Sequence, residues 1–414
     1  MNIDIVGLAV GGDGLGRSAD GRVVFVPGAL PGETVRITVT QEKKSLLRGE
    51  LLEVLTPSPD RQQPWCPHVA DGCGGCGWQH VRPESQPRLK RGTVVEALQR
   101  TAKLHAETAE RVVRLGAELP DRGHRTTVRA AVSTTGKIGM RAHHSDRVVP
   151  IISCGVAHPL LDAVVWSMEV LPDVDEVEVR VSVATGERTA RYVTQLPEED
   201  HDAASAPRSS AFGAPTRRQV TSPPGSVHET IAGVSLRVSP GSFFQTTDVG
   251  AEALVEAVDA AVGRAVSGQM LIDLYGGIGL FAATVGERFD AVTLVELAAA
   301  ACSDARHNLA GRSRAEVIQR DVARWRPART VGPAPVVIAD PARRGLDRAG
   351  VETIAACRPA RVILVSCDVG SYARDVCLLL DAGFELIDAV CIDLFPNTPH
   401  VEVVSTFVPR LPPV

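Results

Sequence analysis

Apolar runs alternate with helix-like periods through the C-terminal part of the chain, from about 229 to 414. Short β-rich runs predict buried strands at Met270–Leu274, Ala291–Val295, Val336–Ala339 and Val362–Val365. Apolar residues at helical spacing predict helices between them, at Gly279–Val285, Ala298–Leu309 and Tyr372–Ala382. This rhythm predicts an α/β fold with a mostly parallel, doubly wound sheet and helices on both faces. Ligands of such sheets bind beyond the carboxyl ends of the strands.

The first 57 residues have a different texture. They are rich in glycine and contain short alternating stretches at Arg22–Val26, Thr34–Thr40 and Gly49–Leu55, separated by GGDGLG and PGALPGE. Short strands with such turns predict a small closed sheet, an OB-like β-barrel. Barrels of this kind often bind oligonucleotides. A β appendage that only packs against its neighbour is the alternative.

The middle of the chain, 58–228, predicts an α+β domain. It opens with a cysteine cluster and continues with a basic, helical stretch. Strand-like alternation follows at Thr127–Ser133 and Glu176–Val183. Residues 196–226 are rich in Pro, Ser, Ala and acidic side chains, and they lack the apolar spacing that a core requires. They predict a flexible surface loop.

Composition limits the class of protein. With 414 residues, 44% of them hydrophobic and 22% charged, the chain is too long for one ordinary domain and is not wholly disordered. Its apolar runs fall far short of the roughly 20 residues of a membrane span. The N-terminus has no pattern of a secretory signal, so we expect a cytoplasmic protein that does not bind membranes. The net charge of −5 means that any RNA contact needs a local basic surface, for which Arg82–Lys103 and Arg122–Arg129 are the candidates.

Three cysteines share one glycine-rich loop. The segment CPHVADGCGGCGWQH contains Cys66, Cys73 and Cys76, and its glycines let the sulfurs converge on one centre. Nine cysteines in a chain without an export signal favour metal binding or catalysis over disulfides. Zinc completed by His68 or His80 is one interpretation, and an iron–sulfur cluster completed by Cys154 is the other. The spacing does not separate them.

A second motif predicts a nucleotide-type site. In MLIDLYGGIGLFAA a strand ends at Asp273 and leads through glycines into a helix, a pattern that suits S-adenosylmethionine better than a dinucleotide. The next strand ends in Glu296, which can accept hydrogen bonds from ribose hydroxyls. Asp321 and Asp340 close two later strands. A dehydrogenase-like or purely structural α/β domain is the alternative.

Two residues are candidates for catalysis. Cys367 lies between a strand and a helix start, where the helix dipole favours a thiolate. Glu402, in DLFPNTPHVEVV, is a candidate general base, as is His400. For each of them a core or loop residue without a chemical role is the alternative interpretation.

Taken in order, CGGCGWQH, SFFQTT, DLYGGIG, DPARRG, SC and FPNTPHVE resemble the bacterial RNA 5-methyluridine methyltransferase family. The resemblance covers nearly the whole chain and is strongest to the iron–sulfur branch that acts on 23S ribosomal RNA. It implies an N-terminal TRAM domain, a central iron–sulfur domain and a Rossmann-like domain that uses S-adenosyl-L-methionine. The transfer RNA branch generally lacks the TRAM domain and the cluster.

The same resemblance implies roles for individual residues. Cys367 would be the nucleophile that attacks C6 of uracil, and Glu402 the base that removes the C5 proton. The residues implied for metal and cofactor are, for a [4Fe-4S] cluster, Cys66, Cys73, Cys76 and Cys154 and, for S-adenosyl-L-methionine, Gln245, Tyr275, Glu296, Asp321 and Asp340. We expect a monomer that methylates 23S ribosomal RNA, with transfer RNA as the weaker choice.

Three departures from the family pattern open further alternatives. This chain has SCDV where the family has SCNP, DPARR where the family has DPPR, and QTT where the family has QTN. The carboxylate of Asp368 should raise the pKa of the Cys367 thiol unless it points away. A metal-stabilised RNA-binding protein without catalysis is one alternative. A methyltransferase that works by direct attack on another base or on protein, with no covalent step, is the other.

Overall fold

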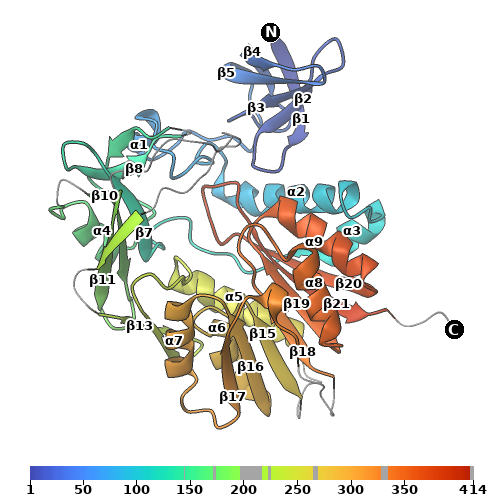
Figure 1. Ribbon diagram of the computed structural model, residues 1–414. Helices are drawn as coiled ribbons and strands as arrows, with labels where there is room; N and C mark the ends of the chain where they lie inside the picture. Colours follow the sequence, from blue (N-terminus) through green and yellow to red (C-terminus); the bar gives the residue numbers. More distant parts are fainter. Residues whose placement is uncertain are drawn as a thin grey trace, which may run out of the picture.

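The computed structural model describes residues 1–143, 145–170, 174–195, 217–221, 225–263, 269–327 and 334–410. Their strands form a closed barrel, a six-stranded sheet, a two-stranded hairpin and an eight-stranded sheet. In Figure 1 the barrel stands at the top, above helix α2 (Gln86–Arg100), with the six-stranded sheet to the left. The loop expected over 196–226 lies mostly outside the described residues. Within it, Arg217–Thr221 forms strand β12.

Alternating apolar residues build the N-terminal barrel. Its strands are β1 (Asn2–Leu8), β2 (Gly14–Arg17), β3 (Val23–Val26), β4 (Thr34–Glu42) and β5 (Leu46–Thr56). They close in the order β1-β2-β3-β5-β4. Ile3 and Ile5 of β1 point into the core while their neighbours are exposed, the period of two that a half-buried strand requires. The predicted barrel is therefore confirmed.

The barrel is packed onto the rest of the protein through one turn and one tryptophan. Leu8 and Leu30 of the barrel share a small apolar cluster with Trp78 and with Leu89 of α2. In the turn after β1, Gly12 has a φ of 92°, and a Cβ there would lie 2.5 Å from Pro399 Cβ and 2.6 Å from Trp78 Nε1. Only glycine fits this contact.

The six-stranded sheet is antiparallel, in the order β12-β11-β10-β7-β8-β9. Its other strands are β7 (Thr127–Val132), β8 (Ile138–Arg141), β9 (Val148–Pro150), β10 (Val174–Val181) and β11 (Arg188–Gln195). Helix α4 (Pro159–Val165) covers it, with Leu161 and Val165 in the same core as Val177. The short helix α1 (Pro67–Ala70) lies in the cysteine segment. The strands β7 and β10 match the two runs that the sequence predicts.

The eight-stranded sheet has the order β17-β16-β15-β18-β19-β21-β20-β6. Its C-terminal strands are β15 (Met270–Leu274), β16 (Ala291–Glu296), β17 (Ala315–Gln319), β18 (Val336–Ala339), β19 (Arg361–Ser366), β20 (Phe384–Ile392) and β21 (Glu402–Pro409). The first five in spatial order are parallel, and β21 runs antiparallel to β19 and β20. The predicted mostly parallel sheet is confirmed.

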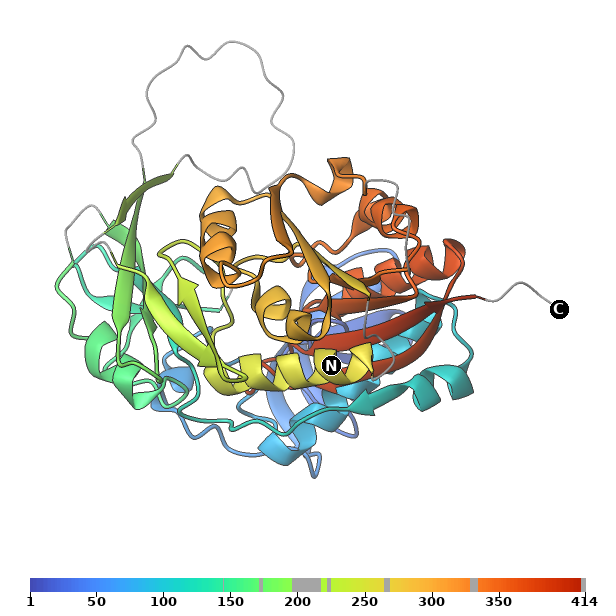
Figure 2. The same ribbon diagram turned by 90° about the horizontal axis from the view of Figure 1, so that it is seen from below.

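Alternate residues of these strands face two cores. Val336 and Ile338 join one cluster with α5 and α7, while Val337 and Ala339 join the other with α8 and α9. The helices are α5 (Asp248–Val262), α6 (Leu280–Ala283), α7 (Ala299–Asn308), α8 (Asp347–Ala356) and α9 (Val369–Asp381). Figure 2, from below, shows α5 along one side of the sheet. Both faces are thus covered, as in a doubly wound fold.

Shorter elements complete the described chain. The hairpin of β13 (Val227–Ile231) and β14 (Val234–Val238) contacts α5 and α7. The 3-10 turns are η1 (Pro83–Ser85), η2 (Val285–Arg288) and η3 (Val322–Arg324). No helix within the described residues is long and apolar enough to cross a bilayer.

Part of the middle segment belongs to the eight-stranded sheet. Strand β6 (Val113–Leu115) pairs in parallel with β20, and α2 and α3 (Ala106–Val112) pack beside it. Arg114 adds an ion pair of 2.8 Å to Asp388 of β20. The division of the chain at 57 and 228 stays a prediction. The docking of β6 shows that the N-terminal half contributes directly to the sheet that carries the site.

Candidate functional site

Four strands of the sheet end side by side in residues that can do chemistry. Asp273 lies in β15, Glu296 ends β16, Asp340 follows β18 and Cys367 follows β19. Because these strands are parallel and adjacent, their carboxyl ends meet at one edge. This is the edge at which ligands of doubly wound sheets bind.

The glycine-rich loop is held by the neighbouring strand. The N–H groups of Tyr275 and Gly276 donate to the carbonyl of Val295, at 2.9 and 3.3 Å. A Cβ on Gly276 would lie 2.6 Å from Leu294, so only glycine lets the loop approach β16. Tyr275 itself has a φ of 60°. The loop is therefore fixed by contacts within the sheet.

Glu296 is oriented by backbone donors. Its Oε1 accepts hydrogen bonds from the N–H groups of Leu297 and Ala298, both at 2.7 Å, and its Oε2 accepts one from Gly277 at 3.1 Å. A carboxylate has about four lone-pair sites, so Oε2 keeps one for a ligand hydroxyl. Asp321 is likewise fixed, because its side chain accepts from the Ala323 N–H at 3.0 Å.

Asp273 is fully buried and only half satisfied. Its Oδ2 accepts from the Ala282 N–H at 3.1 Å, whereas Oδ1 has no partner among the described residues. Burial raises the pKa of Asp273 to about 8, and the charges of Asp340 and Glu296 act in the same direction. An orphaned buried acceptor beside a glycine-rich loop is what a ligand with a donor group would satisfy.

Cys367 and Glu402 come together through strand pairing. Ser366 of β19 pairs with Val403 of β21, so the next residue on each strand places Cys367 beside Glu402. Burial raises the pKa of Glu402 well above its ordinary value, and the charge of Asp340 adds to this. Arg343, in DPARRG, opposes the shift. The nucleophile and base candidates thus share one site.

The electrostatics of the thiol differ from the expectation. Burial raises the pKa of Cys367 to about 12, with further contributions from Glu402 and Asp340 that outweigh Arg343. The helix dipole predicted to favour the thiolate does not dominate, because desolvation and two carboxyl groups oppose ionisation.

The carboxylate of Asp368 points away from the thiol. It caps α9, with its Oδ1 accepting from the Ser371 N–H at 2.8 Å. Asp and Asn are equally good helix N-caps, so SCDV keeps the capping function of SCNP. The charges that act on the thiol are those of Glu402, Asp340 and Arg343.

Gln245 is held in place from the six-stranded sheet. It is 7% exposed and follows β14. Arg180 of β10, itself 5% exposed, donates to the carbonyls of Phe244 and Gln245, both at 3.1 Å, and pairs with Glu229. Phe244 is a core residue, and Phe243 beside it is 72% exposed. Of these two aromatics only Phe243 is available to stack on RNA.

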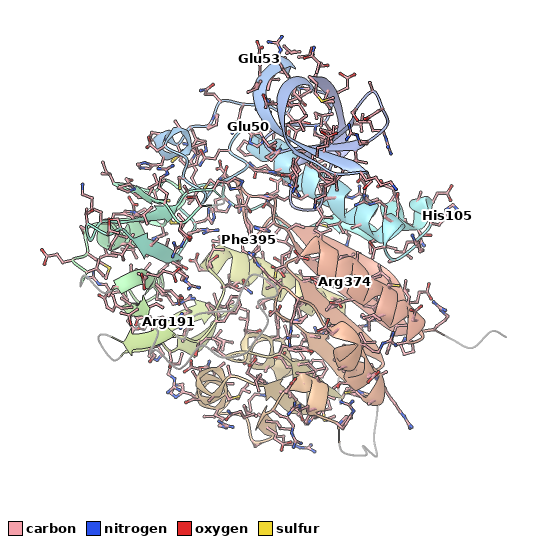
Figure 3. All side chains as sticks on the ribbon, turned by 45° about the horizontal axis from the view of Figure 1, so that its top comes forward. Glu50, Glu53, His105, Arg191, Arg374 and Phe395 are labelled. Carbon is pink, nitrogen blue, oxygen red and sulfur yellow. The ribbon has the colours of Figure 1, made fainter. Side chains whose placement is uncertain are left out.

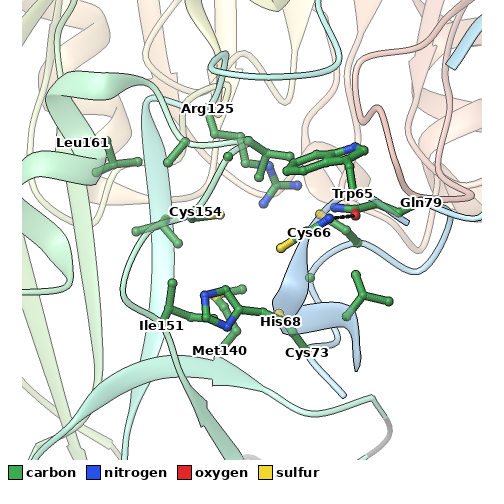
Figure 4. A pocket seen from close by; sticks show the side chains of 17 residues that line it. Trp65, Cys66, His68, Cys73, Gln79, Arg125, Met140, Ile151, Cys154 and Leu161 are labelled. Atoms are coloured by element: carbon green, nitrogen blue, oxygen red, sulfur yellow. Dashed lines mark hydrogen bonds between the residues drawn. The ribbon is translucent and has the colours of Figure 1, made fainter. Parts of the chain in front are cut away.

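The four predicted metal ligands line one enclosed cavity, shown in Figure 4. Cys66, Cys73 and Cys76 reach it from the glycine-rich segment, and Cys154 reaches it from the loop before α4. The Cys66 N–H donates to Gln79 at 3.1 Å, and the Cys154 N–H donates to Asp162 at 2.7 Å. Backbone hydrogen bonds thus fix both loops around the cavity.

The four sulfurs that line the cavity are a donor set that suits zinc or an iron–sulfur cluster. Burial raises the pKa of Cys73 and Cys154, and raises that of Cys76 to about 12. Cys66 and Cys154 also raise the pKa of Cys73 through their charges, so the sulfurs are close. Within the described residues, however, no three side chains stand in metal-ligating geometry. The metal centre stays a prediction.

The histidines of the zinc interpretation are placed differently from each other. His68 lines the cavity, with its Nδ1 3.3 Å from Asp71 Oδ2. His80 is not among the cavity-lining residues, and burial lowers its pKa to about 4. Of the two, only His68 could replace Cys154 as a fourth ligand.

The basic surface predicted from Arg82 to Lys103 is smaller than expected. Lys90 is fully buried and pairs with Asp393, because it lies on the inner side of α2. Arg88 and Arg91 pair with Asp60 and Glu110. The exposed cations of the two candidate regions are Arg82, Arg88, Arg100, Lys103, Arg122 and Arg129.

Sequence reasoning missed the roles of three residues. The sequence marks Asp273 only as the end of a strand, and it does not distinguish Lys90 from the other cations of the basic stretch Arg82–Lys103. Arg343, which acts on both Cys367 and Glu402, was not singled out. Its position in DPARRG, directly after a strand end, is the signal that could have found it.

Comparison with known proteins agrees with this architecture. Residues 1–52 match the TRAM domain. A protein of Streptomyces avermitilis named as an uncharacterized RNA methyltransferase is 32% identical over 432 residues, covering 98% of each chain. One of the same description from Streptomyces coelicolor is 33% identical over 428 residues, covering 98% of this chain and 92% of its own.

A solved structure shares the whole fold. It is the tRNA (uracil-54, C5)-methyltransferase of Pyrococcus abyssi in complex with S-adenosyl-L-homocysteine. The TM-score is 0.70 at 23% identity, and the match covers 99% of this chain and 100% of the other.

Proposed function

The chain belongs to the RNA methyltransferase family of its Streptomyces relatives, and we propose that it methylates C5 of a uridine in RNA. The observation that carries the proposal is the pairing of β19 with β21, which sets Cys367 beside Glu402 at the ligand-binding edge. A thiol and a neighbouring carboxyl group are the two groups that covalent methylation of uracil requires.

S-adenosyl-L-methionine fits the residues at this edge. The loop from Tyr275 to Gly279 lets a ligand approach the backbone, and Glu296 Oε2 can accept from a ribose hydroxyl. The free Oδ1 of Asp273 can accept from an amino group. We assign Gln245, Tyr275, Glu296, Asp321 and Asp340 to this cofactor. When bound, it supplies an electrophilic methyl group.

The proposed chemistry uses Cys367 first. The thiol gives its proton to solvent, Sγ adds to C6 of uracil, and the electrons of the C5–C6 double bond move toward O4 as an enolate. The enolate electrons then form the bond from C5 to the methyl group, and the electrons of the broken carbon–sulfur bond would stay with the sulfur of the donor. Glu402 removes the C5 proton, the double bond re-forms, and the bond from C6 to Sγ breaks. A buried carboxyl group with a raised pKa is suited to this last proton transfer.

We propose 23S ribosomal RNA as the substrate, on the strength of the TRAM domain together with the cysteine cluster. Transfer RNA is the second candidate, because the Pyrococcus abyssi enzyme is named for uracil-54 of tRNA. The uridine would have to leave its stack to reach the buried site. We further propose a cytoplasmic monomer.

For the cavity we propose a [4Fe-4S] cluster held by Cys66, Cys73, Cys76 and Cys154. When bound, such a cluster would cross-link the glycine-rich segment to the loop before α4. Purified protein should be brown and contain acid-labile sulfide, and Cys154→Ser should lose both. Colourless protein with stoichiometric zinc would overturn the assignment.

The test of the function is adduct formation. With S-adenosyl-L-methionine and RNA containing 5-fluorouridine, the protein should form a covalent complex stable on a denaturing gel, because fluorine cannot be removed from C5 as a proton can. Cys367→Ala should form none, whereas Cys377→Ala, on the helix α9 that follows Cys367, should behave as the unchanged protein. Methyl transfer by Cys367→Ala would favour direct attack, and no transfer by the unchanged protein would favour an RNA-binding protein. Mapping 5-methyluridine in ribosomal and transfer RNA with and without the protein identifies the substrate.

A further inference from the structure

A lysine is buried where the N-terminal parts meet the catalytic sheet. Lys90 of α2 is 0% exposed. Its Nζ donates to the carboxylate of Asp393 and, at 3.0 Å, to the carbonyl of Phe395. The ammonium also lies 5.8 Å from the ring centroid of Trp78. Lysines are almost never fully buried unless they are paired, so this position needs a reason.

The segment that Lys90 contacts is an anchored loop, residues 393–400. Its centre, Asn397, has a φ of 64°. The Asn397 N–H donates to Gln86 Oε1 at 2.7 Å, and the Trp78 N–H donates to the Asn397 carbonyl at 2.8 Å. The Asn397 side-chain amide donates to the carbonyl of Asp121, also at 2.8 Å. All these anchors precede residue 122 in the chain.

The anchored loop leads directly into the base. It ends two residues before Glu402, which is 3% exposed, with buried Val401 between. The rings of Phe395 and His400 meet edge to face, 6.1 Å apart, and close the loop on itself. Figure 3 places Phe395 near the centre of the molecule, where the N-terminal parts face the sheet. The position of the loop therefore sets where the Glu402 carboxyl group stands.

We infer that Lys90 is a positioning residue for Glu402, an inference that rests on the proposed function. A buried ion pair adds little stability over a well-packed apolar pair, so stability alone does not account for it. The ammonium instead fixes the position of the anchored loop. It holds the Asp393 carboxylate and the Phe395 carbonyl of that loop next to the ring of Trp78. Lys90 touches no reacting atom. It holds the loop so that the Glu402 carboxylate can reach the proton on C5.

The test separates the base step from the steps before it. The adduct with 5-fluorouridine RNA needs the Cys367 attack and methyl transfer but not the base. In Lys90→Met the rate of adduct formation should stay within about twofold, while kcat on uridine RNA falls about 100-fold, the cost of roughly 1 Å of misplacement. Lys137→Met, an exposed lysine in the turn between β7 and β8 and outside both candidate basic regions, is the control and should change neither rate.

A second variant guards against simple unfolding. Lys90→Met leaves Asp393 buried without its partner, whereas Lys90→Met with Asp393→Leu removes both charges. The double variant should recover the Tm but keep the loss of kcat, because the Phe395 carbonyl still lacks its donor. Normal kcat in the double variant, or equal losses of kcat and adduct formation in both variants, would overturn the inference. Absence of the adduct in the unchanged protein would instead reject the proposed function.

Discussion

The two loops on either side of Cys367 are held in opposite ways. The glycine-rich loop from Tyr275 to Gly279 bonds to Val295 and Glu296 of the adjacent strand, within the sheet itself. The anchored loop, residues 393–400, bonds to Lys90, Gln86, Trp78 and Asp121, all from the N-terminal parts. The half of the site that would hold the methyl donor is therefore intrinsic to the fold. The half that would carry the proposed base, Glu402, depends on contacts with the N-terminal parts of the chain.

Each of the two loops has a buried carboxyl group close by, and the two groups differ in whether they have a partner. No cation is among the groups that shift the pKa of Asp273, beside the glycine-rich loop, and its Oδ1 has no hydrogen-bond partner within the described residues. Asp393, in the anchored loop, has Lys90 as its counter-ion. A ligand can complete the first group, whereas the second is already complete. This contrast gives the following predictions.

Removing the base should have the largest effect. In Glu402→Gln the carboxyl group is gone but the shape remains, so we expect kcat to fall about 10²–10⁴-fold. Methylated RNA should stay bound to Cys367, because the C5 proton is not removed. A denaturing gel with unmodified RNA measures this complex. Glu385→Gln, an exposed position on β20, is the control, and release of product at the normal rate would contradict the role.

Loosening the glycine-rich loop should affect the donor and not the base. Glu296→Ala removes the acceptor of three backbone N–H groups, so the Kd for S-adenosyl-L-methionine should rise about 10–100-fold. Calorimetric titration measures it. RNA affinity should not change, and Glu316→Ala, an exposed position on β17, should leave the Kd unchanged. If the Kd for RNA rose by the same factor as the Kd for S-adenosyl-L-methionine, the donor half and the base half of the site would not be independent.

Loosening the anchored loop should lower kcat and leave the binding of the methyl donor unchanged. Asn397→Ala loses the bond to Asp121 and strains the left-handed backbone by about 1–3 kcal/mol, so kcat should fall about tenfold. The Kd for the methyl donor should stay constant. Asn397→Gly keeps the backbone conformation and should recover part of the loss. If the donor Kd rises instead, the loop is not specific to the base.

The smallest effect is on the pH dependence of stability. The pKa of Asp273 is raised from 3.8 to about 8, so the folded state keeps a proton between these values that the unfolded state releases. Stability is then full below the unfolded pKa and falls as pH rises through the window. Asp340, raised to about 7, acts in the same direction. Without ligands, the Tm should be about 5 °C lower at pH 8 than at pH 5.

Asp273→Asn isolates this contribution. It removes the titrating group while keeping an acceptor for the Ala282 N–H, so the Tm should depend less on pH between 5 and 8. An unchanged slope would assign the effect to other groups. A Tm that rises with pH in the unchanged protein would contradict the sign of the shift.

The sequence predicted the sheet-borne half of the site well because its signals are local. Strand, acidic residue and glycines follow one another in MLIDLYGGIG, and β15 forms over the predicted residues. The four cysteines that the resemblance implies as metal ligands all line one cavity. Their roles as ligands stay a prediction, as do those of Cys367 and Glu402.

The other half could not be predicted, because its contacts join distant segments. Lys90 and Asp393 are 303 positions apart, and β6 pairs with a strand more than 270 residues away. A lysine among arginines indicates a surface, and only the tertiary packing of α2 puts Lys90 inside. The raised pKa of Cys367 could not be predicted for the same reason, because it depends on burial and on Glu402, which the distant strand β21 brings beside it.

The contact at Gly12 bears on the distance between two points at which an RNA would be bound. The turn after β1 packs closely against Trp78 and Pro399, and this contact favours one position of the barrel relative to the edge that carries Cys367. A nucleotide held on the barrel and a uridine held at Cys367 would then be separated by a constant span. The protein would then accept only RNAs whose fold places a uridine at that distance from the segment bound by the barrel. The barrel would contribute to the choice of substrate as well as to affinity.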